Sequence, residues 1–82
     1  MMVDFGKSTS QEVYDVIVEL YAKLRKPIPL YLLYDWIRYR KRLGLTTNQI
    51  KGALKYLFDH GKLKWAREGH LIPSEADNNE GV

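Results

Sequence analysis

Residues 45–72 of this 82-residue chain, LTTNQIKGALKYLFDHGKLKWAREGHLI, contain the pattern that decides the fold. Thr46 or Thr47 can cap a helix, and Thr46 and Gln49 have the spacing of a capping box. Apolar residues follow at helical spacing, and Gly61 supplies a left-handed C-cap. The pattern predicts an amphipathic helix whose buried stripe consists of Ile50, Ala53, Leu54, Leu57 and Phe58.

Beyond Gly61 the pattern changes to that of a short basic hairpin. Leu63 and Trp65 alternate with lysine and alanine, and Gly69 permits a tight turn before residues 70–72 return. Because a tryptophan two residues after a core leucine usually packs under the sheet, we expect Trp65 in the core. The alternative is that its ring stacks on a base of a single-stranded ligand.

Helix, glycine and basic hairpin, in that order, resemble the recognition helix and wing of winged helix-turn-helix DNA-binding domains. The resemblance is to compact regulators of bacteria, archaea and archaeal viruses, and it covers residues 10–72. It implies an α+β fold, mostly α, with three helices and a short C-terminal β-hairpin as the wing. Residues 1–9 are expected to be a flexible N-terminus and residues 73–82 a disordered acidic tail.

Two earlier helices complete the expected domain. Hydroxyl residues at 8–10 offer N-caps for a first helix that runs to about Arg25. Prolines keep residues 26–29 extended, where winged-helix domains have their first strand beside the wing. A second helix is expected over residues 30–43, with Gly44 as its stop. Its apolar face is expected to contain Leu32, Leu33, Trp36, Ile37, Tyr39 and Leu43.

The charges of the chain are segregated along the sequence. The net charge is +3, but residues 23–67 hold twelve lysines and arginines against two aspartates, a net charge of +10. The segments before and after are acidic. Such segregation favours one face built for a polyanion, although exposed lysines that serve only solubility are the alternative.

Composition excludes several classes of function. No cysteine is present, which removes disulfides, thiolate catalysis and Cys-type zinc sites, and two histidines make a metal or another cofactor unexpected. The longest apolar run, residues 28–34, is too short to span a bilayer, and residues 1–10 have no apolar signal core. A cytoplasmic protein without a membrane partner is expected.

Catalytic groups are few. Asp15 and Glu19 lie one turn apart, but nothing in the pattern places them in an apolar pocket that would separate their pKa values. His60 follows Asp59, and adjacent side chains on a helix diverge, which is poor geometry for a general base. We do not expect an enzyme.

The resemblance assigns base reading to the polar side of the predicted third helix. Asn48 and Gln49 can pair bidentately with adenine, and Lys51 can donate to guanine. A recognition helix meets base edges in its first turns. The alternative is an ordinary solvated face. The expected base-reading residues are Thr47, Asn48, Gln49, Lys51 and Lys55.

Contacts to the DNA backbone are expected from the second helix and the wing. Four cations within five residues exceed what the dipole at a helix C-terminus needs, so we favour phosphate contact over that alternative. Gly52 costs about 1 kcal/mol in mid-helix and would permit close approach to a phosphate or to the second helix. The expected backbone residues are Arg38, Arg40, Lys41, Arg42 and Gly52, and the wing residues are Lys62, Lys64 and Arg67, with Arg67 at the tip.

The first helix has a wider apolar arc than one packing contact needs. Tyr14, Val18 and Tyr21 widen it, and they are the expected surface of a possible homodimer. The expected function is sequence-specific binding of double-stranded DNA by a small transcriptional regulator. The alternative is a winged-helix module that binds protein within a larger assembly, with the first helix as its contact surface.

Overall fold

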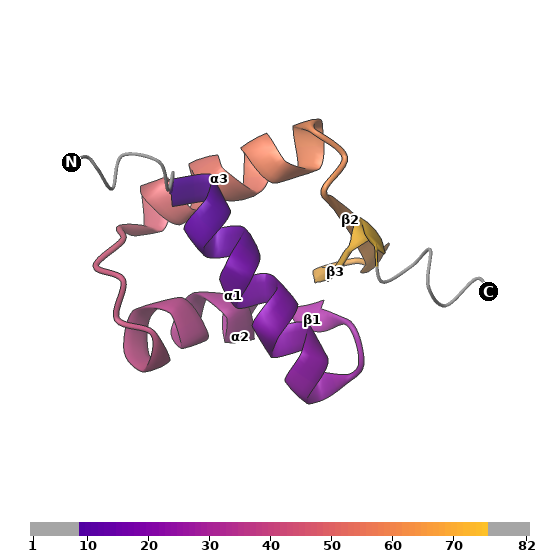
Figure 1. The fold of residues 1–82 in the computed structure, drawn as a ribbon, viewed down its shortest axis with the longest axis horizontal. Helices are drawn as coiled ribbons and strands as arrows, with labels where there is room; N and C mark the ends of the chain where they lie inside the picture. The colour runs from indigo at the N-terminus through magenta and orange to yellow at the C-terminus, as the bar shows by residue number, and fades with distance from the viewer. Residues whose placement is uncertain (1–8, 76–82) are drawn as a thin grey trace.

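The computed structural model describes residues 9–75, which form three helical segments and three short strands (Figure 1). This mostly helical α+β fold confirms the predicted class, with a winged-helix-like order of elements. The second helical segment has two parts, α2 and η2, that follow one another directly. The elements are α1 (Thr9–Leu24), β1 (Ile28–Pro29), α2 (Leu30–Asp35), η2 (Trp36–Arg40), α3 (Thr47–Asp59), β2 (Leu63–Arg67) and β3 (His70–Pro73).

The three strands form one antiparallel sheet in the order β1-β3-β2. Ile28 in β1 pairs with Leu71, so the extended segment expected before the second helix is part of the sheet. Arg67 pairs with His70 across the turn, and the register of β2 shifts between Trp65 and Arg67. β3 continues to Pro73, one residue beyond the predicted end of the domain. The rest of the predicted tail, from residue 76, lies outside the described residues, as does most of the predicted N-terminal segment.

The core lies around α1, which contacts α3, β1 and β3. In Figure 1, α2 and α3 lie on either side of α1, and the hairpin lies at one end of the molecule. Helical spacing places one stripe of α1 inside, as the sequence predicts. Burial of each of these aliphatic side chains contributes about 1.5–3 kcal/mol to the stability of the folded state. Fully buried side chains are Val13, Ile17, Leu20, Ile28, Leu33, Ile37, Ile50 and Leu71.

The second helix is shorter than predicted and does not keep α-helical spacing. After Asp35 the chain makes a π-turn, in which the Lys41 amide donates to the Trp36 carbonyl at 3.0 Å. The helix ends at Arg40, and the predicted continuation to residue 43 is wrong. Arg42 then takes a left-handed φ of 49°, which turns the chain before Gly44 is reached.

The π-turn changes which side chains face the core. A π-turn adds one residue to a helical turn, so the residues after it are rotated relative to α-helical spacing. Leu33 and Ile37 are fully buried as predicted, but Tyr39, which was expected on the apolar face, is 69% exposed. Tyr31 is 72% exposed, so the second helix presents two tyrosines that the apolar pattern did not identify as surface residues.

Both ends of α3 are capped as the sequence predicts. Thr46 accepts a hydrogen bond from the Gln49 amide at 3.1 Å, and the Gln49 side chain accepts one from the Thr46 amide at 2.8 Å. Gly61 has a φ of 73°, and the amides that follow the helix donate back to its last carbonyls, as in a Schellman motif. The two ends of α3 are therefore set by local sequence.

Candidate nucleic-acid interface

The exposed face of α3 lies opposite its buried stripe, as the helical wheel predicts. Asn48, Lys51, Gly52 and Lys55 are all exposed. Among the described residues, neither Asn48 nor Lys51 has a hydrogen-bond or ion-pair partner. Both side chains project from the first two turns of the helix, so they are available to an external ligand.

The side chains of two other predicted base-reading residues already form hydrogen bonds within the protein. Gln49 is part of the capping box, and the Thr47 hydroxyl accepts a hydrogen bond from the Arg38 guanidinium. The second contact joins the π-turn to the start of α3. A ligand that used Thr47 or Gln49 would have to replace these internal contacts, so Asn48 and Lys51 are the stronger candidates.

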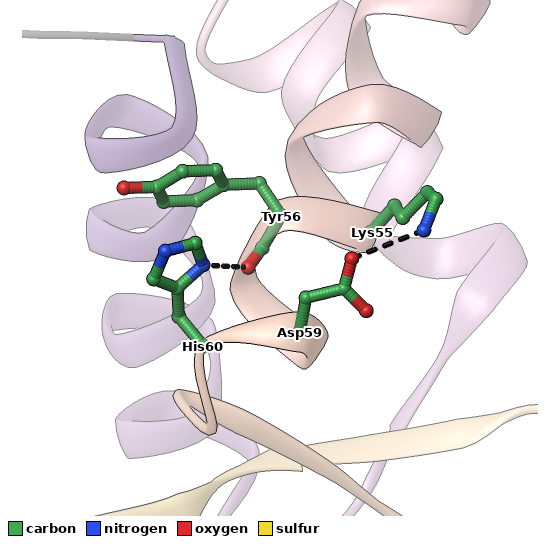
Figure 2. Close-up of polar contacts among 4 residues, drawn as sticks. All are labelled: Lys55, Tyr56, Asp59 and His60. Atoms are coloured by element: carbon green, nitrogen blue, oxygen red, sulfur yellow. Dashed lines mark hydrogen bonds and ion pairs between the residues drawn. The ribbon is translucent and has the colours of Figure 1, made fainter.

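The last turn of α3 holds two further local contacts (Figure 2). Lys55 forms an ion pair with Asp59, with Nζ and Oδ2 3.0 Å apart. Tyr56 and His60 stack with ring centroids 4.0 Å apart, and His60 Nδ1 donates to the Tyr56 carbonyl at 2.9 Å. Exposed i,i+4 pairs are worth only about 0.3–0.5 kcal/mol. A phosphate could therefore take Lys55 from Asp59 at little cost.

The four cations expected to bind phosphates point in different directions. Arg38 reaches Thr47 on α3, and the Arg40 guanidinium lies over the Trp36 ring, 4.9 Å from its centroid. Lys41 is bound to α1, and Arg42 has no polar side-chain partner among the residues described. The π-turn and the left-handed φ of Arg42 separate side chains that a regular helix would place on neighbouring faces. A common phosphate contact by all four is therefore not what this geometry favours.

Lys41 connects the second helix to α1. Its Nζ lies 2.8 Å from Oε1 of Glu19. The hydrogen bond from Lys41, with the charges of Lys41 and Lys23, lowers the pKa of Glu19, although partial desolvation acts in the opposite direction. Lys41 therefore takes part in a contact with α1 that a phosphate would have to replace.

One prediction about the β2–β3 hairpin, the predicted wing, is wrong. Trp65, which we expected in the core, is 51% exposed and stacks on Phe58 of α3, with ring centroids 4.7 Å apart and planes at 19°. Burial of β2 ends at Leu63, because the strand is at the edge of the sheet and the hairpin leads away from the core. The stack holds the wing against the C-terminal half of α3.

The three wing cations occupy separate environments. Arg67 is exposed beside the turn that contains Gly69, as predicted for the tip. Lys64 is exposed on β2. Lys62 lies 5.8 Å from the centroid of the Tyr14 ring on α1, so it is directed away from the tip. Arg67 is therefore the wing cation best placed to reach a ligand beyond the hairpin.

The predicted dimer surface on α1 is narrower than the sequence indicates. Val18 is 43% exposed, but Tyr14 and Tyr21 are half-buried and pack against the core. Burial, followed by the charges of Glu75 and Asp15, raises the pKa of Tyr14. The homodimer stays a prediction.

Other classes of site find no support in the described residues. Residues 9–75 contain no group of three or more histidines, aspartates and glutamates that could hold a metal ion. None of their helices is both long and apolar enough to cross a membrane. No family model, curated protein or solved structure matches the chain.

The contribution of the Glu19–Lys41 pair to stability is expected to be lost in acid. The pKa of Glu19 is lowered by folding, so the pair stabilises the protein above the ordinary glutamate pKa of 4.5, and this stabilisation disappears as the pH falls through the lowered value. Urea denaturation should give a higher midpoint for the parent than for Glu19→Gln at pH 7, and the two midpoints should converge in acid. Glu12→Gln, on the same helix, is the control. A constant difference between parent and Glu19→Gln at all pH values would contradict the assignment.

Proposed function

We propose that the protein binds double-stranded DNA with α3 in the major groove and acts as a transcriptional regulator. The observation that carries the proposal is the exposed face of α3, where Asn48 and Lys51 have no partner among the described residues. At the start of this helix lies Arg38, and at its end the Phe58–Trp65 stack holds the wing. A helix with readable side chains, flanked by a cation and a basic hairpin, is suited to a groove lined by phosphates.

The two available side chains have complementary base preferences. An asparagine amide can donate to N7 of adenine and accept from its N6 amino group. A lysine ammonium can donate to O6 and N7 of guanine. Asn48 and Lys51 are three residues apart, about 4.5 Å along the helix axis. Neighbouring base pairs are about 3.4 Å apart. The pair can therefore address adjacent steps of one groove.

The cations outside α3 would provide affinity without sequence preference. Arg38 and Arg42 lie on either side of the end of the second helix, and Arg67 lies at the wing. Phosphate contacts release counterions, so such binding weakens steeply with salt. This division of roles assigns sequence reading to α3 and most of the electrostatic affinity to the flanking elements.

A substitution at Gly52 is expected to have opposite effects on stability and on DNA binding. It is helical and exposed, and a Cβ at this position would meet no atom within 4 Å, so the fold itself does not require glycine. Gly52→Ala should raise the free energy of unfolding by about 1 kcal/mol, measured by urea denaturation. If a phosphate approaches this backbone, the same variant should bind duplex DNA more weakly. A variant with unchanged stability would refute the first expectation, and one with unchanged DNA affinity would remove Gly52 from the interface.

Salt dependence tests the phosphate contacts. The double variant Arg38→Ala, Arg42→Gly removes two cations and leaves glycine at the left-handed position. Its affinity for any duplex should fall, and the slope of log affinity against log salt should become shallower by about 0.9 for each lost contact. Lys23→Ala on α1 is the control for a lost charge elsewhere. An unchanged slope would place the second helix outside the interface, and an absence of duplex binding by the parent would favour the protein-binding alternative.

The roles of α3 and the wing can be separated with a binding selection from random duplexes. Asn48→Ala or Lys51→Ala should cost about 1–3 kcal/mol on the selected site and less on random DNA. Arg67→Ala should weaken binding to both by similar factors, because its contacts carry no sequence information. The roles would be reversed if Arg67→Ala changed the selected sequence and Asn48→Ala did not.

A further inference from the structure

A hollow of about 420 Å³ lies between the end of α1 and the hairpin, away from the exposed residues of α3 discussed above. Tyr21, Arg25 and Lys26 line it from the α1 side, and Lys64 and Trp65 line it from β2. Its volume is within the range of small-molecule sites. None of the residues expected to read bases lines it, and Lys64 is the one expected wing residue that does.

The lining of the hollow carries charge of one sign. Among the residues that the structure describes, three of those that line the hollow are cations and none is an aspartate or glutamate. Within the described part of the chain, Arg25 and Lys26 have no ion pair or side-chain hydrogen bond. Cations gathered in a concave surface without a carboxylate raise the local positive potential, which favours an anionic ligand.

The same hollow contains aromatic surface. Phe58 covers one face of the Trp65 ring, yet the tryptophan remains 51% exposed. Tyr21 lines the hollow from the helix side. An exposed tryptophan ring beside cations is the combination that stacks a planar base and binds the phosphate attached to it.

The backbone at Arg25 allows its side chain to be removed without strain. Arg25 follows the last residue of α1 and has a φ of 59°, a conformation that glycine adopts readily and other residues adopt at a cost. Its amide donates to the Tyr21 carbonyl at 2.7 Å, so the backbone there serves only as a helix cap. Glycine fits this backbone, so Arg25→Gly would remove the guanidinium from the hollow and leave the cap in place.

We propose that this hollow binds a nucleoside phosphate. The base lies against Trp65 and Tyr21, and the phosphate is held by the cations of Arg25, Lys26 and Lys64. The ligand is either a free nucleotide or a nucleotide within a single strand, which present the same chemistry. The proposal does not depend on duplex binding by α3.

Tryptophan fluorescence tests the proposal directly. The full chain contains two tryptophans, and the buried Nε1 of Trp36 has no hydrogen-bond partner among residues 9–75. Trp36→Phe should therefore be tolerated and leave Trp65 as the only reporter. Titration with ATP should quench Trp65 saturably. Arg25→Gly, which fits the left-handed backbone, should weaken ATP binding at least tenfold without lowering the melting temperature. The matched control is Arg42→Gly, the other left-handed arginine, which lies outside the hollow and should bind ATP as the parent does.

Two results would overturn the proposal. If tripolyphosphate bound as tightly as ATP, the base would contribute nothing to affinity. If Arg25→Gly and Arg42→Gly lost ATP affinity equally, the loss would be due to net charge and not to a site in the hollow. A further arm distinguishes the two sources of the ligand. A thymidine tetranucleotide that binds more tightly than thymidine monophosphate, with the same loss in Arg25→Gly, assigns the hollow to a nucleotide within a strand, and equal affinities assign it to the free nucleotide.

Discussion

Burial of one stripe of α1 is the constraint on which the remaining structure depends. Val13, Ile17 and Leu20 are fully buried, and the helix that carries them contacts α3, β1 and β3. The sheet has a two-residue strand at one edge and cannot bury its inner face without this helix. α3 is likewise amphipathic and needs a partner for its apolar stripe. The exposed face of α3 is therefore a consequence of where α1 lies.

The π-turn has the largest effect on the candidate interface. It ends the second helix early and sends successive basic side chains to α3, to the Trp36 ring and to α1. Arg38 and Lys41 thereby contact other helices, Arg40 contacts the Trp36 ring, and Arg42 has neither a polar nor a ring partner in the described region.

Exposed ion pairs and unpaired cations have different consequences for DNA binding. Lys55–Asp59 and Lys41–Glu19 are both surface pairs, which contribute little to stability. The carboxylates of these pairs lower the positive potential of the free protein, but each lysine can still exchange its carboxylate for a phosphate. Lys51 has no partner among the described residues to give up, so the full free energy of its contact with DNA would contribute to binding. The proposed interface therefore depends more on a few unpaired residues than on the net charge of the basic segment.

The sequence by itself determined the elements whose signals are local. The capping box at Thr46, the glycine at Gly61 and the apolar stripe between them define α3, and alternation with a glycine turn defines the hairpin. These signals involve hydrogen bonds and φ values within a few residues, so no distant contact is needed to predict them. The order of elements and the exposed face of α3 follow from the same patterns.

Only the tertiary structure decided the features that depend on residues far apart in the chain. The exposure of Trp65 depends on Phe58 and on how far the hairpin extends past the core, which alternation alone does not specify. The π-turn was not predicted by the apolar pattern, and Tyr39, two residues after the buried Ile37, is exposed. Pairing of Lys41 with Glu19 joins residues 22 positions apart. Side-chain periodicity predicts which face is apolar, but the packing of one element on another determines which polar side chains remain available.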